Sequence, residues 1–185
     1  MQRKESGMSN LAALVLRAVL GGLLAGHGAQ KLFGHFNGPG IEGTSGFMEM
    51  LGLKPGRPWA YLAGLSEFGG GALTALGLLN PVGPLGVIGA MAMATATAHR
   101  GQPIWVTEGG AELPVTNIAA ATALMLNGPG KYSLDRALGI RLPSWFALLG
   151  LVAIVLSVIY GPGGGGETSP EEDEAREELA GEGEA

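Results

Sequence analysis

Hydrophobic positions in this chain are gathered into long runs instead of alternating with polar ones. Four such runs cover residues 11–33, 59–79, 82–98 and 113–127. About 20 helical residues cross the hydrocarbon core of a bilayer, and a helix bonds its backbone groups internally. The runs therefore predict four transmembrane helices. The fourth run is short for a span and needs a tilt or a contribution from preceding residues.

The breaks between the runs predict how the helices connect. Asn80 and Pro81 leave almost no connection between the second and third runs, so we expect these two helices to be antiparallel neighbours. Gly128, Pro129 and Gly130 end the fourth helix. The residues from 131 to 141 then predict a polar connector.

A fifth apolar run extends from Trp145 to Tyr160. It carries no charge and has an aromatic residue at each end, as interfacial anchors often do. A helix lying on the membrane surface is the alternative, but the absence of charge favours insertion. The predicted fold is therefore all-α: a transmembrane four-helix bundle within 11–138, with a fifth, C-terminal transmembrane helix within 139–161.

The two ends of the chain differ from this apolar body. Residues 1–10 form a short polar N-terminus, and residues 162–185 form a glycine-rich linker and an acidic tail that we expect to be disordered. The tail carries nine acidic side chains and one basic one, whereas the rest of the chain is net positive, so the net charge of -5 arises entirely from the tail. Basic residues elsewhere are scattered and not interleaved with aromatic residues, so no nucleic-acid partner is expected.

Cysteine is absent from the sequence, which excludes disulfides, thiol redox chemistry, iron–sulfur ligation and c-type haem attachment within the chain. The sequence also has no evident flavin motif and no recognised metal-ligand spacing, and no metal site is expected. If the chain takes part in a redox reaction, we expect a bound non-thiol cofactor or a partner to carry the electrons.

Small residues recur inside the apolar runs, and the chain has 34 glycines. In lipid, small residues let helix backbones approach closely. Gly22 and Gly26 form a small-xxx-small pair in the first run. Ala90, Ala94 and Ala98 recur at about one helical turn in the third. We expect both sets to mark tightly packed helix contacts.

The distribution of basic residues predicts the orientation in the membrane. With the N-terminus inside, the positive-inside rule places more basic residues in the cytoplasm than outside. The cytoplasmic set is Arg3, Lys4, Lys131, Arg136 and Arg141, against Lys54, Arg57 and Arg100 outside. We therefore expect a multi-pass protein with a cytoplasmic N-terminus.

Ionisable residues within the runs are the candidates for chemistry, because a charge at bilayer depth is costly and normally faces the bundle interior with a partner. Glu67 is alone in its run, so we expect it to pair with Arg17 or Lys31. The candidate ligand-binding residues are Arg17, His27, Gln30, Lys31, Glu67 and His99, and Glu112 joins His27, Lys31 and Glu67 in a candidate catalytic cluster.

Two interpretations of this cluster stay open. In the functional one, His27 and Glu67 move protons, and Lys31 or Arg17 holds an anionic or carbonyl-bearing ligand. In the structural one, an ion pair only fixes the helix register, Arg17 extends to the lipid headgroups, and His99 is solvated at the interface.

Several short motifs occur in a fixed order. His27 to Gly34 reads HGAQKLFG, Glu67 to Gly70 reads EFGG, and Gly109 to Glu112 reads GGAE. Gly128, Pro129 and Gly130 follow, with Ser133 to Asp135 after them. Together these motifs resemble those of DoxX-type membrane proteins. The resemblance implies a four-helix membrane bundle and points to His27, Lys31, Glu67 and Glu112. The fifth run and the acidic tail depart from it.

The resemblance also implies a functional class. One related branch, DoxD, is a subunit of a thiosulfate:quinone oxidoreductase, and mycobacterial relatives are membrane partners of superoxide-detoxifying and sulfur-transfer enzymes. It implies an integral membrane subunit of an oxidoreductase system in a bacterial or archaeal plasma membrane. Quinone would be the cofactor, and soluble redox enzymes or further copies of the chain the partners. Whether the chain is catalytic or an accessory subunit stays open. The alternatives are a non-enzymatic anchor or assembly factor and a small transporter or lipid-binding protein.

Overall fold

The computed structural model describes residues 7–162, and every regular element in this part of the chain is helical. The all-α prediction is confirmed for these residues. The expectations for the first six residues and for the linker and acidic tail from residue 163 onwards lie outside them. The helices are α1 (Gly7–Phe33), α2 (Gly40–Met50), α3 (Gly56–Leu76), α4 (Val82–Ala96), α5 (Glu112–Asn127), α6 (Leu134–Leu138) and α7 (Trp145–Tyr160), with 3₁₀ turns η1 (His35–Asn37) and η2 (Val106–Glu108).

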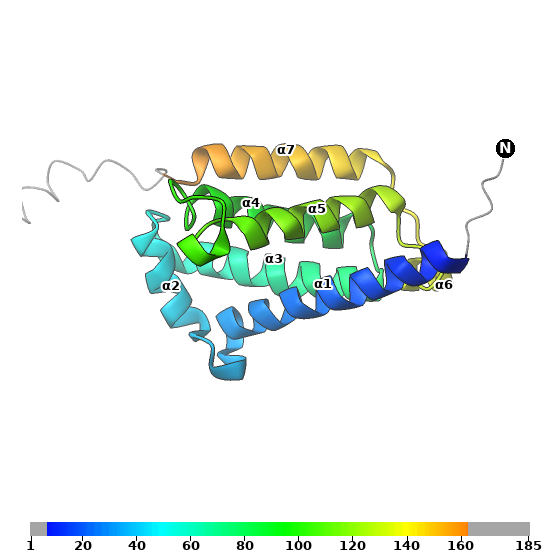
Figure 1. Ribbon diagram of the computed structural model, residues 1–185, viewed down its shortest axis with the longest axis horizontal. Coiled ribbons are helices and arrows are strands. Elements are labelled where there is room, and N and C mark those ends of the chain that lie inside the picture. The colour runs from blue at the N-terminus through cyan, green and yellow to red at the C-terminus, as the bar shows by residue number, and fades with distance from the viewer. Residues whose placement is uncertain (1–6, 163–185) are drawn as a thin grey trace, which may run out of the picture.

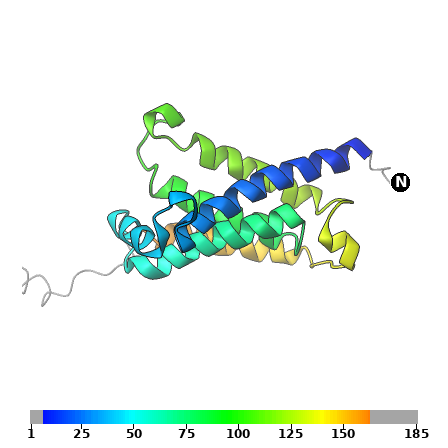
Figure 2. The ribbon, with the colours of Figure 1, turned by 90° about the horizontal axis from the view of Figure 1, so that it is seen from below.

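The five longer helices, α1, α3, α4, α5 and α7, lie along the long axis of the molecule (Figure 1). The short helix α2 lies at one end of the bundle and α6 at the other (Figures 1 and 2). Helix α4 packs against α3, α5 and α7, while α1 packs mainly against α3. Helix α4 is therefore the centre of the bundle, and α7 is attached to the rest mainly through it.

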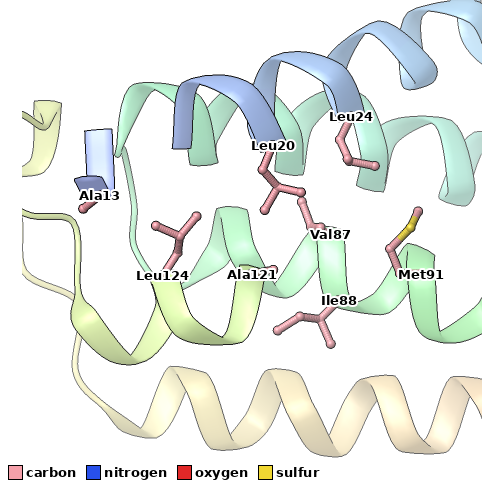
Figure 3. Close-up of a cluster of buried hydrophobic side chains, with 8 residues drawn as sticks. All are labelled: Ala13, Leu20, Leu24, Val87, Ile88, Met91, Ala121 and Leu124. Carbon is pink, nitrogen blue, oxygen red and sulfur yellow. The ribbon is translucent and has the colours of Figure 1, made fainter. Parts of the chain in front are cut away.

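The core contains buried apolar residues of α1, α4 and α5. Figure 3 shows most of these side chains between the three helices, with Ile88 pointing toward α7. The cluster consists of Ala13, Leu20, Leu24, Val87, Ile88, Met91, Ala121 and Leu124. Since these residues come from helices far apart in sequence, their burial holds the first and last thirds of the bundle on α4.

All five predicted runs are helical, but several helix boundaries differ from those of the runs, and α3 begins at Gly56, three residues before its run. The second run ends at Leu76 rather than at residue 79, because Gly77 adopts a left-handed conformation (φ 61°) and its N–H caps the carbonyls of Leu73 and Thr74. The third helix ends at Ala96, and the first begins at Gly7, ahead of its apolar run. Residues from 145 to 160 were predicted correctly.

Two helices lie where the sequence predicted only connections. Helix α2 occupies part of the segment between the first two runs and buries Thr44 and Met48, one helical turn apart. Glycines and polar residues surround these two positions in the sequence, so the hydrophobic pattern does not indicate this short buried face. Helix α6 lies inside the predicted polar connector. Ser133 caps its start by accepting a hydrogen bond from Arg136 N, and Gly139 ends it with φ 70°.

The glycine contacts predicted for the first run lie on a neighbouring face of the helix. A Cβ atom added to Gly22 or Gly26 would meet no atom within 4 Å. A Cβ atom on Gly21 would lie 2.5 Å from Gly71 O, and one on Gly28 would overlap Phe68. Adjacent residues of a helix point about 100° apart, so the prediction selected the wrong glycines of the right helix.

The outer surface of the bundle is strongly apolar. Helix α7 has no buried residue, and seven of its Leu, Val and Ile side chains are exposed: Leu148, Leu149, Leu151, Val152, Val155, Leu156 and Ile159. Within residues 7–162, α1 alone is both long and apolar enough to cross a membrane by itself, whereas α4 and α7 are apolar but have 15 and 16 residues. Water is a poor solvent for such a surface.

Candidate ligand cavity

A buried ion pair joins α1 to α3. Lys31 Nζ, on the last turn of α1, lies 2.5 Å from Glu67 Oε1, in the middle of α3. The Glu67 side chain is 4% exposed and that of Lys31 is 27% exposed. The structure thus pairs Glu67 with one of its two expected partners, and because both charges are largely removed from solvent, each depends on the other for stabilisation.

This buried ion pair lies at the wall of a cavity of about 310 Å³. Apolar side chains from four helices form most of the lining, including Met48 of α2, Trp59 and Leu62 of α3, Met93 of α4 and Ile154 of α7. Polar atoms reach it from few positions: Lys31, Glu67, Ser66, Thr97 and Ser157. The cavity is therefore a predominantly apolar chamber with one charged patch.

Small residues of α4 and of the turn that follows it form one wall of the cavity. Gly86, Gly89, Ala90, Ala94 and Ala98 all line it. The prediction that Ala90, Ala94 and Ala98 mark tight packing is corrected in part: Ala90 packs against the core cluster, but all three residues also line the hollow beside α4. Sequence spacing identifies a face of small residues but not whether a neighbouring helix fills it.

Helix α7 closes one side of the cavity and is seated on α4 by close contacts. A Cβ atom on Gly150 would overlap the Leu85 side chain, and one on Gly89 would lie 3.3 Å from Ile154 Cγ1. Each glycine receives a large apolar side chain of the opposite helix. Ile154 and Ser157 therefore occupy fixed positions in the cavity wall.

The second carboxylate oxygen of Glu67 has no hydrogen-bond partner. Glu67 is 3% exposed, and Oε2 is fully enclosed without a donor in the described part of the chain. Ser157 Oγ donates to Ile154 O at 2.8 Å, which leaves the hydroxyl oxygen able to accept. Buried polar atoms usually have partners, and because the residue Glu67 lines the cavity, its unpaired oxygen indicates a place where a ligand can donate.

The other candidate site residues do not line this cavity. His27 is exposed on α1, and Gln30 packs against Gly38 in the turn that follows. His99 Nδ1 lies 2.6 Å from Gly109 O, and Glu112 Oε2 accepts a hydrogen bond of 3.0 Å from Val106 N. His99 and Glu112 thus hold the loop between α4 and α5, separately from the buried ion pair.

Arg17 has a structural position at the opposite end of the bundle. It is 3% exposed and donates hydrogen bonds to Pro129 O (2.7 Å) and Tyr132 O (2.5 Å). The expectation that Arg17 extends to lipid headgroups was therefore wrong. Its partners are carbonyls of the segment after α5, which the sequence pattern cannot reveal.

Asp135 is a buried charge that the sequence analysis quoted only as part of a motif. Its two carboxylate oxygens accept hydrogen bonds of 2.8 Å from Leu79 N and Asn80 N, in the turn between α3 and α4. Asp135 is 3% exposed. It fixes that turn to α6, and the cap at Ser133 is the one local signal that could have indicated its position.

Comparison with known proteins places this geometry in a family. Residues 12–100 match the family model described as DoxX. Residues 12–100 are therefore a DoxX segment. The match runs from α1 past the end of α4 and contains both members of the buried ion pair, so this ion pair is part of the DoxX segment. The DoxX match, the long apolar α1 and the apolar surface agree with a small membrane protein. No curated protein and no solved structure matches the chain.

The DoxX match is shorter than the resemblance seen in the motifs. Helices α5, α6 and α7 lie beyond residue 100, as do the motifs at Gly109 and Gly128. Helix α7 nevertheless supplies part of the cavity wall. The cavity is therefore built from the DoxX segment together with a helix outside it.

Proposed function

We propose that this DoxX protein is a multi-pass membrane subunit of an oxidoreductase system that binds a quinone ring beside Lys31 and Glu67. The observation that carries the proposal is a predominantly apolar cavity of about 310 Å³ with a buried ion pair in its wall. An engineered cavity of about 150 Å³ holds a benzene ring. The cavity of this DoxX protein therefore has room for a substituted ring.

The apolar surface supports several membrane spans. Helix α3 has 21 residues, which corresponds to about 31 Å of helix. Helices α4, α5 and α7 have 15 or 16 residues and reach only about 24 Å. Short spans are accommodated by local bilayer thinning or by apolar flanking residues. We propose that all five longer helices cross the membrane, as the sequence predicts.

The orientation follows from the same proposal. With a cytoplasmic N-terminus in a bacterial or archaeal plasma membrane, α1 ends on the exterior side. In this proposed orientation the cavity, which Lys31, Trp59 and Thr97 line, lies in the exterior half of the bundle. A quinone in the bilayer reaches this depth directly, since its ring and tail are both lipid-soluble.

The two charged groups suit the chemistry of a quinone. A quinone carbonyl oxygen accepts hydrogen bonds, and Lys31 Nζ has donors besides the one that it gives to Glu67. Reduction of a quinone takes up two electrons and two protons, and Glu67 is the group at the cavity that can hold a proton. Because the chain has no cysteine, we propose that a partner redox enzyme supplies the electrons.

Tryptophan fluorescence tests the binding of quinone to the full-length protein in mild detergent. A short-tailed benzoquinone should quench Trp59, which lines the cavity, in a saturable way. Trp59→Phe should remove most of the saturable signal and leave the background from Trp105 and Trp145. Lys31→Met should weaken binding about tenfold, while the control Lys54→Met, an exposed lysine outside the cavity, should not. Quenching that is linear and unaffected by Trp59→Phe contradicts the proposal.

A further inference from the structure

The carboxylate of Glu67 is only half satisfied. Lys31 pairs with Oε1 at 2.5 Å, whereas Oε2 is buried without a donor from residues 7–162. Leaving a buried acceptor unpaired costs free energy, and a charged acceptor costs more than a neutral one. The backbone N–H groups of α3 are engaged within the helix and cannot turn toward it. A donor on a bound molecule is what this oxygen lacks.

The charge of the cavity restricts that molecule further. Lys31 and Glu67 are the two ionisable residues among those described that line it, and their charges cancel. An anion would be repelled by Glu67, and a cation by Lys31. With no uncompensated charge in an apolar chamber, a neutral molecule is favoured.

The apolar walls determine the chemical character of the rest of the ligand. Trp59, Leu62, Met93 and Ile154 present apolar surface, and the short side chains of Ala90 and Ala94 line the cavity on the α4 side. A molecule that donates a hydrogen bond at one point and is apolar elsewhere satisfies both the walls and Glu67. Hydroxyl groups on a ring or an alkyl chain meet this description.

We propose that the cavity binds a neutral lipophilic molecule through a hydroxyl group that donates a hydrogen bond to Glu67 Oε2. This inference deepens the proposed function and rests on it in one respect: a quinol, the reduced form of a quinone, is such a molecule. A long-chain alcohol offers the same chemistry from a lipid source. The quinol and the alcohol share the hydroxyl group that donates the hydrogen bond, and they differ in the apolar part that fills the cavity.

Matched ligands test the hydrogen bond directly on the wild-type protein, so the test does not depend on a variant that folds. A short-tailed benzohydroquinone is compared under anaerobic conditions with its dimethyl ether, which has the same ring but no donor. A charge-assisted hydrogen bond predicts binding at least about tenfold tighter for the hydroquinone. Decanol and decyl methyl ether form the corresponding lipid pair. Calorimetry measures all four.

The variant Glu67→Gln provides the second arm. Its amide oxygen takes the place of Oε1 at Lys31 and its NH₂ group faces the cavity, so the preference for the hydroxyl ligand should disappear. Equal affinities for each hydroxyl compound and its ether in wild type overturn the inference, as does a preference that survives Glu67→Gln in a protein with unchanged melting temperature.

The failure of this inference is distinguishable from the failure of the proposed function. Saturable binding of the quinone with no preference for hydroxyl over ether overturns the inference alone. A preference for decanol over its ether, without binding of quinone or hydroquinone, supports the inference and overturns the quinone proposal. Absence of binding by every probe overturns both.

Discussion

Lys31 and Glu67 meet beside a close approach of α1 and α3, at Gly28 and Phe68. A side chain at Gly28 would overlap Phe68, and the adjacent Glu67 receives Lys31 Nζ at 2.5 Å. The close backbone approach and the buried ion pair thus belong to one contact. The absence of a side chain at position 28 allows a lysine from the end of one helix to reach the middle of the next.

Removing Glu67 should destabilise the fold. Glu67→Ala leaves Lys31 without its counter-charge, and we expect a loss of about 2 to 4 kcal/mol because the pair is largely buried. The double variant Lys31→Met, Glu67→Met should recover much of this loss. Reversible unfolding in detergent measures the effect. The control is Glu42→Ala, which breaks an exposed pair with Arg57 (3.4 Å) and should cost less than about 1 kcal/mol. Equal losses for Glu42→Ala and Glu67→Ala would contradict this prediction.

Alanine substitutions at two adjacent glycines of α1 should change the stability of the protein in opposite directions. Gly21→Ala places a methyl group 2.5 Å from Gly71 O and Ala75 N, so we expect a loss of about 1 to 3 kcal/mol as the helices separate. Gly22→Ala meets no atom within 4 Å and should stabilise by about 0.5 to 1 kcal/mol through helix propensity. Thermal unfolding compares the two variants. Similar effects at both positions would show that the contact face of α1 is wrongly assigned.

The sequence predicted the long helices because each apolar run is long enough to bury or embed a whole helix. It missed α2, whose buried positions Thr44 and Met48 are separated by glycines and polar residues. It also selected Gly22 and Gly26 over Gly21 and Gly28, because glycine spacing gives the period of a helix but not its rotation about its axis.

The same limit applies to the candidate site. Glu67 could be paired from sequence, since it is alone in its run and only Lys31 and Arg17 were available in the preceding one. The role of Arg17 could not be predicted from the sequence, because its partners are backbone carbonyls more than a hundred positions away (Pro129, separation 112). The cavity itself depends on what α7 leaves unfilled, which is a property of tertiary packing alone.

Weakening the Asp135 contact should loosen the end of the bundle opposite the cavity. In Asp135→Asn, one oxygen is replaced by an NH₂ group that faces the N–H of Leu79 or Asn80, so we expect a loss of about 1 to 3 kcal/mol. Limited proteolysis after α5 should become faster. Glu108→Gln, an exposed carboxylate in η2, is the control. Unchanged stability and proteolysis would exclude this role for Asp135.

Filling the cavity should block binding without harming the fold. Ala90→Leu directs a larger apolar side chain into the space beside α4, and we expect quinone affinity to fall at least about tenfold, with a stability change within about 1 kcal/mol. Ala119→Leu, at an exposed position of α5, is the matched control and should bind normally. Full affinity in Ala90→Leu would place the quinone outside this cavity.

Because α7 packs on α4, the cavity is lined by residues from two separate regions of the chain. The charged pair that defines what a guest must offer chemically lies within residues 12–100, whereas Ile154 and Ser157, which limit how large the guest is, lie far beyond them. An exchange of Ile154 changes the size of the accepted molecule and leaves the requirement for a donor at Glu67 intact. The size of the ligand and the hydrogen-bonding group that it must carry are therefore determined by residues that can change independently of one another.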